Sequence, residues 1–180
     1  MGTPRRARKI TLERMTDMQI IVDTREQKPY SFCKFSDVTV IRATLQSADY
    51  SLPGFEDVVG LERKSLDDLV GCLTSGRERF ERELHRLRSF DLRAVVVEAN
   101  MVDLARGNYR SQMNPTAAVN SVLAFQQRYD VPFLFAGSRE AGEYCTYQLL
   151  RLWLKDAQER AGAILASMNA TTTLHDTLTM

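Results

Sequence analysis

The sequence predicts an α/β fold in which a mixed central sheet is flanked by helices. Three observations lead to this class. The chain has 180 residues, of which 44% are hydrophobic, enough for one substantial core. Strand-like segments come first, and strand-like and helix-like segments then alternate. No repeat or linker interrupts this order, so we expect a single domain.

Six short segments have the composition of β-strands. Some are continuous apolar runs typical of buried strands, such as the run before Asp23, and another alternates apolar with polar residues. Pro53 and Gly54 form a strong turn signal, so the strands on either side of them should make a hairpin. The expected strands are 18–22, 37–43, 49–52, 58–64, 94–98 and 131–136.

Four segments have the periodicity of helices. Apolar residues recur at helical spacing from Leu66 to Leu73, and again from Phe80 to Leu87. Asn114 and Pro115 supply an N-cap and a proline at the first position of the third helix. The expected helices are 66–73, 77–90, 114–129 and 138 to about 166.

The two ends of the chain differ from this body. Residues 1–17 are basic and polar and residues 167–180 are polar, so we expect a flexible arm and a flexible tail around a domain at 18–166. No apolar run reaches the roughly 18–20 residues of a membrane span, and the N-terminus lacks the apolar stretch of a signal peptide. We therefore expect a cytoplasmic protein with no membrane partner. Three widely spaced cysteines without a cysteine–histidine cluster argue against a zinc site or a disulfide framework.

One pair of acidic residues is predicted to meet across the hairpin. If its loop is centred between Phe55 and Glu56, Asp49 lies opposite Glu62, with Cβ atoms roughly 4.5–5.5 Å apart. Carboxylates this close repel unless a cation lies between them, and oxygen ligands without Cys or His favour Mg²⁺ or Mn²⁺. Lys64 shares the face of Glu62, where it can orient water or stabilise the charge of phosphodiester hydrolysis. An edge with ordinary ion pairs is the alternative for this fragment alone.

Three ordered motifs add to this pair. They are IVDTRE at 21–26, ADYSL at 48–52 and ERKSLDD at 62–68. Together they closely resemble the nuclease domain of the XPF family of structure-specific DNA endonucleases, in a stand-alone version such as occurs in bacteria and their viruses. The family hallmark is Glu-Arg-Lys, three residues and Asp, and it is matched by Glu62, Arg63, Lys64 and Asp68. The resemblance covers about residues 19–135 and implies a three-layer, restriction-endonuclease-like fold.

The resemblance also implies the catalytic residues. Asp23, Asp49 and Glu62 would bind the metal, and Lys64 would assist hydrolysis. The alternative for Asp23 is a polar residue at a strand-ending turn. Glu98 ends a later strand, and we expect an ordinary strand-end residue there rather than a member of the site.

Residues around the motifs have supporting roles in this interpretation. Glu26 would be a secondary ligand or a partner of a ligand. Arg63 would contact DNA or orient its neighbours. Asp68 has a local role, because Ser65 and Asp68 form a capping box for the next helix. Ala48 stands where the family usually has glycine, which should be tolerated unless the position needs a positive φ.

Arginines supply the expected DNA contacts. Arg77 and Arg79 follow a short loop at a helix start, where a DNA phosphate can bind, whereas a solvated, salt-bridged face is expected for the rest of that helix.

No G-x-x-x-x-G-K-[ST] loop is present, so we expect no nucleotide cofactor. The segment after Gly137 shows no helix-hairpin-helix, so the grip on DNA should come from the domain itself, a homodimer or another protein. The expected DNA-binding residues are Arg25, Arg63, Arg77 and Arg79.

The predicted function is a metal-dependent endonuclease that hydrolyses phosphodiester bonds in branched, flap or junction DNA during repair or recombination. Mg²⁺ is the expected ion, with Mn²⁺ the other ion that suits an oxygen site. The protein would associate with the nucleoid when it binds DNA. Two alternatives remain: a catalytically silent DNA-binding or scaffold subunit, and a less selective nuclease or exonuclease of the same superfamily. The presence of both Glu62 and Lys64 favours the enzyme.

Overall fold

The computed structural model describes residues 17–178, with side chains as far as Met168. Apart from Asp17, the predicted basic arm lies outside the described residues. The strands are β1 (Met18–Asp23), β2 (Val38–Ala43), β3 (Tyr50–Ser51), β4 (Val59–Lys64), β5 (Leu92–Val97) and β6 (Phe133–Phe135). The helices are α1 (Leu66–Leu73), α2 (Arg77–Leu87), α3 (Met101–Arg106), α4 (Pro115–Tyr129) and α5 (Arg139–Leu178).

The strands form one six-stranded sheet in the order β2-β1-β3-β4-β5-β6. β1 runs parallel to β2 and antiparallel to β3, and β3 runs antiparallel to β4. β4, β5 and β6 are parallel to one another, which requires crossover connections that here contain helices. The sheet is therefore mixed, as the sequence predicts.

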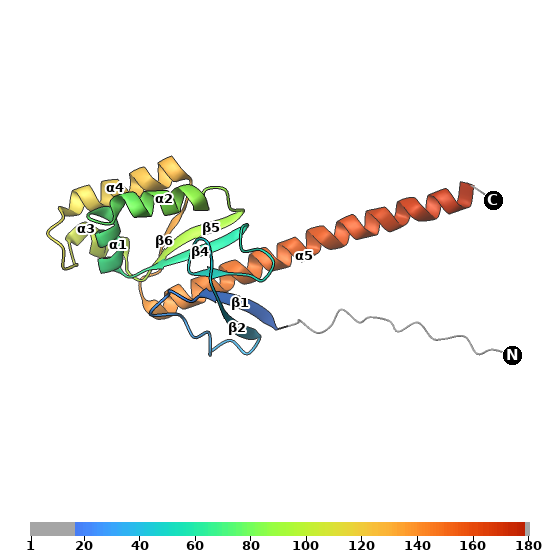
Figure 1. The fold of residues 1–180 in the computed structure, drawn as a ribbon, viewed down its shortest axis with the longest axis horizontal. Helices are drawn as coiled ribbons and strands as arrows, with labels where there is room; N and C mark the ends of the chain where they lie inside the picture. The colour runs from blue at the N-terminus through green and yellow to red at the C-terminus, as the bar shows by residue number, and fades with distance from the viewer. Residues whose placement is uncertain (1–16, 179–180) are drawn as a thin grey trace.

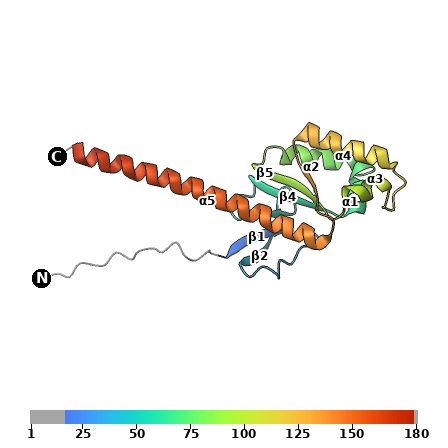
Figure 2. The ribbon, with the colours of Figure 1, turned by 180° about the vertical axis from the view of Figure 1, so that it is seen from behind.

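Helices cover both faces of the sheet. On one face, buried side chains of α1, α2, α3 and α4 pack with those of β5 in one apolar core. On the other face, α5 packs on residues of β1, β3 and β4 in a second core. Figures 1 and 2 show α1 to α4 grouped on one side and α5 crossing the other. This is the three-layer arrangement expected for a restriction-endonuclease-like fold.

Helix α5 is longer than the sequence indicates. It continues to Leu178 instead of ending near Ala166, and its later part runs beyond the body of the protein (Figure 1). Its first half packs on the sheet through Tyr147 and Leu150, whereas Ile164 and Leu165 farther along are exposed. No helix among the described residues is long and apolar enough to cross a membrane.

Local capping explains an element that periodicity does not predict. Helix α3 has only six residues, too few for an amphipathic repeat to be recognised. Asn100 and Asp103 form a capping box at its start, and Gly107 ends it in the left-handed conformation. These capping residues are the sequence signal for this helix.

The predicted hairpin forms with the predicted register. Tyr50 in β3 pairs with Leu61 in β4, as the predicted turn centre requires. The Asp49 amide also donates to the Leu61 carbonyl, at 3.1 Å, so Asp49 and Tyr50 share one partner and regular pairing ends at Tyr50. The hairpin thus brings the two acidic residues together at one end of the sheet.

Candidate active site

The centre of the site is the pair of carboxylates from the hairpin. Asp49 Oδ2 accepts a hydrogen bond from the Arg63 amide at 2.8 Å. Glu62 is only 4% exposed, and its Oε2 atom is buried without a hydrogen-bond partner among the described residues. A buried carboxylate oxygen without a partner is costly, so this atom needs a ligand that supplies positive charge or a proton.

The charges around this pair are crowded. Burial, and then the nearby charge of Glu62, raise the pKa of Asp49 well above its ordinary value. Lys64 Nζ contacts Glu62 Oε1 and lies 5.5 Å from the centre of the Phe80 ring. Burial by itself lowers the pKa of Lys64, but the Glu62 carboxylate outweighs it and raises that pKa, so the ammonium stays charged.

Glu83 on α2 is a third acidic residue at this place, and the sequence analysis missed it. Burial, followed by the charge of Glu62, raises the pKa of the Glu83 carboxyl well above its ordinary value. Its position contains a signal, because Glu83 lies between Phe80 and Leu84, which are both buried on the inner side of α2. A glutamate beside the apolar face of a helix is directed partly inward.

Asp23 has a different environment, although its amide donates to the Asp49 carbonyl at 2.8 Å. Both of its carboxylate oxygens are used: Arg25 donates to Oδ1 and Oδ2 at 2.8 and 2.9 Å, and the Leu45 amide donates to Oδ2 at 2.7 Å. Burial alone raises the pKa of Asp23, but these hydrogen bonds hold it below its ordinary value. The structure thus uses Asp23 to fix Arg25 and the chain at Leu45, and does not direct it toward Glu62.

These contacts test which residues fit a divalent cation. In the part of the chain that the structure describes, no group of three His, Cys, Asp or Glu side chains is arranged to hold a metal ion. Asp49 and Glu62 nevertheless fit one, because both supply hard oxygen atoms, they repel each other, and Glu62 Oε2 lacks a partner. Asp23 does not fit in this arrangement, because its oxygens already accept hydrogen bonds. The metal-binding role expected for Asp23 has no support in this geometry.

The Arg63 side chain is buried and paired with carboxylates. It is only 6% exposed, donates from Nε to Glu98 Oε1 at 2.8 Å, and lies 3.8 Å from Glu26 Oε1. Of the two roles expected for Arg63, the orienting role agrees with these contacts and a direct DNA contact does not. Glu26 is its partner here, and Glu98, at the end of its strand, is a second, buried partner of Arg63.

The capping role expected for Asp68 is confirmed. Ser65 is the N-cap of α1, and its hydroxyl accepts from the Asp68 amide at 3.2 Å. The same hydroxyl donates to Asp68 Oδ2 at 2.6 Å. The last residue of the hallmark motif therefore helps to fix the start of α1, the helix that follows β4.

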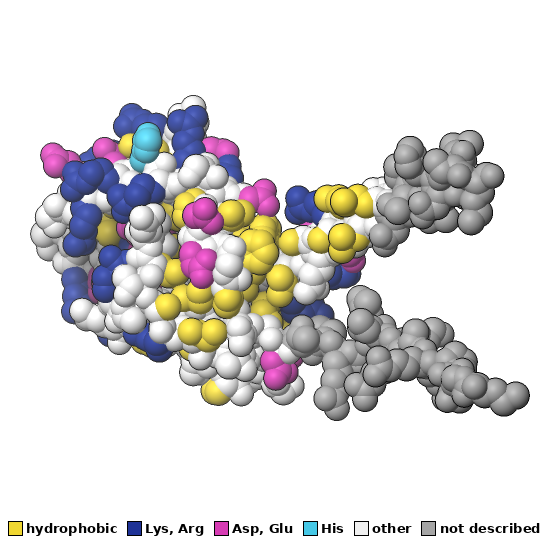
Figure 3. Space-filling model, turned by 45° about the vertical axis from the view of Figure 1, so that its right-hand side comes forward, with side chains coloured by type: hydrophobic (Ala, Val, Ile, Leu, Met, Phe, Trp, Pro, Cys, Tyr) yellow, Lys and Arg dark blue, Asp and Glu magenta, His cyan; other side chains and the backbone are white. Residues whose placement is uncertain are grey.

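A cavity of about 580 Å³ opens beside the carboxylates. Arg25 and Arg79 lie on its wall, and both are exposed. Arg77 turns elsewhere: its guanidinium lies 4.5 Å from the centre of the Phe125 ring, and Nε lies 3.2 Å from Glu81. Figure 3 shows that Lys and Arg side chains gather over one end of the molecule, away from the projecting helix. Arg25 and Arg79 thus agree with the expected DNA contacts, whereas Arg77 is held in place by α4.

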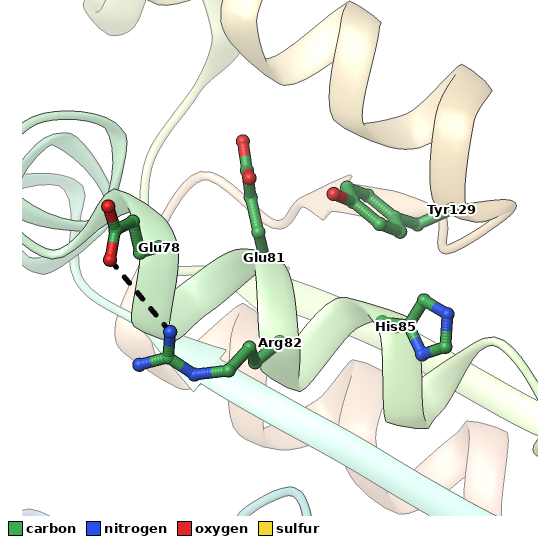
Figure 4. Close-up of a pocket in the computed structure, with 5 residues that line it drawn as sticks. All are labelled: Glu78, Glu81, Arg82, His85 and Tyr129. Atoms are coloured by element: carbon green, nitrogen blue, oxygen red, sulfur yellow. Dashed lines mark ion pairs between the residues drawn. The ribbon is translucent and has the colours of Figure 1, made fainter.

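A second hollow lies between α2 and α4. Glu78, Arg82 and His85 from α2 and Tyr129 from α4 are among its lining residues (Figure 4). Glu78 and Arg82 form an exposed ion pair at 3.9 Å, one helical turn apart. Such pairs are typical of a solvated helix surface, as expected for this stretch of α2. This hollow lacks the buried, crowded carboxylates of the first cavity.

Ala48 departs from the expectation of an ordinary backbone. Its φ is 68°, in the left-handed region, and its side chain is 4% exposed. The position therefore needs a positive φ, which is the case in which alanine is expected to be tolerated poorly. Its Cβ atom makes the left-handed conformation costly. The strain lies directly before Asp49.

The comparisons with known proteins agree with this architecture. The family model described as the ERCC4 domain matches residues 22–148. XPF from Aeropyrum pernix has 24% identity and a TM-score of 0.60, over 83% of this chain and 73% of that chain. The same protein in complex with DNA has 23% identity and a TM-score of 0.61, over 77% of this chain and 66% of that chain. No match was found among curated proteins. At these identities the solved structures show a shared fold.

Proposed function

This chain belongs to the ERCC4-domain family and is an XPF-family nuclease domain, and from this premise we propose that it is a divalent-metal-dependent DNA endonuclease. The observation that carries the proposal is the crowding of three carboxyl groups: Glu62 raises the pKa of both Asp49 and Glu83, and Glu62 Oε2 is buried without a well-formed hydrogen bond among the described residues. A carboxylate pair with this deficit is suited to binding a cation. Its location beside the hallmark lysine supports a role for that cation in the reaction.

Asp49 and Glu62 would hold Mg²⁺ or Mn²⁺. When bound, such an ion polarises a phosphoryl oxygen and lowers the pKa of water. Lys64 Nζ, which contacts Glu62, places a fixed positive charge where negative charge develops on the phosphate. The Arg63 amide holds Asp49 Oδ2 in place, so the backbone of the hallmark motif orients one of the two carboxylates.

Arg25 and Arg79 would bind DNA phosphates at the wall of the cavity. Their exposed guanidinium groups can approach a backbone that does not enter the narrow part of the site. Such contacts contribute affinity and depend on salt, without reading sequence. The solved XPF in complex with DNA supports DNA as the substrate of this fold.

The finer assignment follows the family resemblance. We propose that the substrate is branched, flap or junction DNA, and that the biological setting is repair or recombination. The domain would span 18–166. The grip on the substrate would come from this domain, from a second copy of it, or from another protein.

The test is cleavage of labelled DNA by the full chain, by Asp49→Asn and by Lys64→Ala. The substrates are a three-prime flap, a fork, a four-way junction, a linear duplex and a closed circle, each with Mg²⁺, with Mn²⁺ and with a chelator. We expect metal-dependent cuts near the branch that both substitutions abolish. Glu56→Gln, in the exposed hairpin turn, is the matched control and should cut at the normal rate.

Each other outcome identifies a different function. Binding of branched DNA without cutting in either metal would favour the silent scaffold subunit. Cutting that needs a free end, so that closed circles stay whole, would favour an exonuclease. Equal cutting of linear duplex and branched DNA would contradict the proposed substrate class.

A further inference from the structure

The end of β5 meets the beginning of α5 behind the active site. Glu98 follows β5 directly, and its amide donates to the Lys64 carbonyl at 2.9 Å, which places it beside the catalytic strand. Arg139 is the first residue of α5. The side chain of Glu98 is only 8% exposed, so this carboxylate needs partners for its charge.

Glu98 accepts from two arginines. Arg63 donates to both of its oxygens, at 2.8 Å from Nε to Oε1, and Arg139 donates to Oε1 at 3.0 Å. Glu26 Oε1 lies 3.8 Å from Arg63 on its other side. These four residues, which we call the Glu98 bridge, contain two positive and two negative charges that balance.

Arg139 extends the bridge to the chain that lines the cavity. Its second terminal nitrogen donates to the carbonyls of Lys28 and Pro29 at 3.0 and 2.8 Å. Its guanidinium also lies 5.0 Å from the centre of the Tyr30 ring. The loop before these carbonyls, residues 24–28, includes Arg25 and Glu26, which line the cavity. A single buried carboxylate therefore links this loop, α5 and the hallmark motif.

We propose that Glu98 and Arg139 are positioning residues of the active site. Glu98 accepts from the Arg63 side chain and from Arg139, and so fixes the Arg63 guanidinium. The backbone amide of the same Arg63 donates to Asp49 Oδ2. They also hold the loop at 24–30 through its carbonyls. Errors of about 1 Å in such an arrangement slow reactions on the order of 100-fold, which gives the bridge an effect on rate beyond its effect on stability.

A second arginine–carboxylate pair on the same strand provides a control with an exposed carboxylate, because the Asp130 side chain is 77% exposed. Arg93, near the other end of β5, pairs with Asp130 far from the carboxylate site. Asp130 has a left-handed backbone, which asparagine accepts well, so Asp130→Asn removes one charge without new strain. An effect seen in the Glu98 variants but not in Asp130→Asn is therefore specific to the Glu98 bridge and is not a general result of losing an ion pair.

The first measurement is hydrogen exchange in the protein without DNA or metal. In Glu98→Gln and Arg139→Gln, we expect the amides of residues 24–30 to exchange faster by about tenfold or more, with no such change in Asp130→Asn. Unchanged exchange in both bridge variants would overturn the proposal. Arg139 is 41% exposed at its side chain, so Arg139→Gln should fold even if Glu98→Gln does not.

The second measurement rests on the proposed function. Single-turnover cleavage should slow by about 10- to 100-fold in both bridge variants, while the Kd for DNA stays within about twofold. Arg139→Lys, which restores the charge and one donor, should recover part of the rate. Wild-type rates in both bridge variants would overturn the positioning role, as would slower cleavage explained by a weaker Kd. If the wild type cuts no DNA, the proposed function fails, and hydrogen exchange still decides whether the bridge positions the loop.

Discussion

Asp23 and Asp49 are adjacent in the sheet and have opposite surroundings. The Asp23 amide donates to the Asp49 carbonyl, so the two residues are backbone neighbours. The Asp23 carboxylate accepts hydrogen bonds on both oxygens, and they lower its pKa. Asp49 lies near Glu62, and burial together with that charge raises its pKa. One aspartate is stabilised as a charged group, and the other is destabilised.

The number of hydrogen-bond donors around each carboxylate explains why the pKa values of these two aspartates shift in opposite directions. Hydrogen bonds from Arg25 and from the Leu45 amide give Asp23 nothing further to bind. Glu62 contacts Lys64 through Oε1, but its Oε2 has no hydrogen-bond partner among the described residues, and this is the oxygen that we propose binds a cation. Burial raises the pKa of both carboxyl groups, and the supply of hydrogen-bond donors, which outweighs burial only at Asp23, separates the two.

The largest expected effect is on catalysis at Asp49. Asp49→Asn should lower the cleavage rate by at least about 100-fold, because it removes half of the carboxylate pair that would hold the metal. The unfolding free energy of the metal-free protein should stay the same or rise, since the repulsion with Glu62 is removed. Single-turnover cleavage and urea unfolding with a chelator measure both quantities. A cleavage rate of Asp49→Asn within tenfold of the wild-type rate would contradict the proposed role of Asp49 as a metal ligand.

Asp23→Asn should act mainly on stability. It removes the charge that accepts from Arg25 and Leu45, and we expect a loss of about 2 kcal/mol in urea unfolding at pH 7. At a temperature where the variant is folded, its cleavage rate should fall much less than that of Asp49→Asn. A rate loss equal to that of Asp49→Asn, with stability unchanged, would instead place Asp23 among the metal ligands.

The pH dependence of Asp23 has a definite sign. The pKa of its carboxyl is lower in the folded protein than in the unfolded chain, so its contribution to stability is present above the unfolded pKa and is lost as the pH falls. We expect the stability difference between wild type and Asp23→Asn to shrink below about pH 4. A difference that stays constant from pH 7 to pH 3 would contradict the contacts seen here.

Mg²⁺ should distinguish the two aspartates without any DNA. At a concentration about 100-fold above its Kd, a single bound ion stabilises the folded state by about 2.7 kcal/mol. Thermal unfolding with Mg²⁺ or a chelator should show this gain for the wild type and for Asp23→Asn, but not for Asp49→Asn. Ca²⁺ serves as a second oxygen-binding ion. Equal gains in all three proteins would place the ion elsewhere.

The smallest effect is expected at Ala48, directly before Asp49. Ala48→Gly relieves the left-handed strain at φ 68° but loses a buried methyl group, and we expect a net gain of less than about 1 kcal/mol in unfolding free energy. Ala94→Gly is the matched control, because Ala94 is equally buried inside β5. It should lose stability. A loss at Ala48 as large as that at Ala94 would show that the left-handed backbone costs little here.

Much of the fold follows from local patterns in the sequence. Apolar runs and the Pro53-Gly54 turn predict the strands, and the turn centre predicts the observed pairing of Tyr50 with Leu61, which brings Asp49 near Glu62. The cap at Ser65 and the Asn114-Pro115 start are likewise observed. Such features depend on residues within a few positions of one another, or on one hairpin, so the sequence alone determines them.

The partners of the site residues depend on segments far apart in the chain. Arg63 meets Glu98 from β5, which in turn meets Arg139 from α5, and Glu83 reaches Glu62 from α2. Asp23 is satisfied by the Leu45 amide, which has no sequence pattern. Hydrogen bonds and charges act over a few ångströms, so only the packed layers decide which side chains meet. Local sequence patterns are therefore enough to predict the strands and the hairpin, whereas the packing of distant segments sets which carboxylates have hydrogen-bond partners.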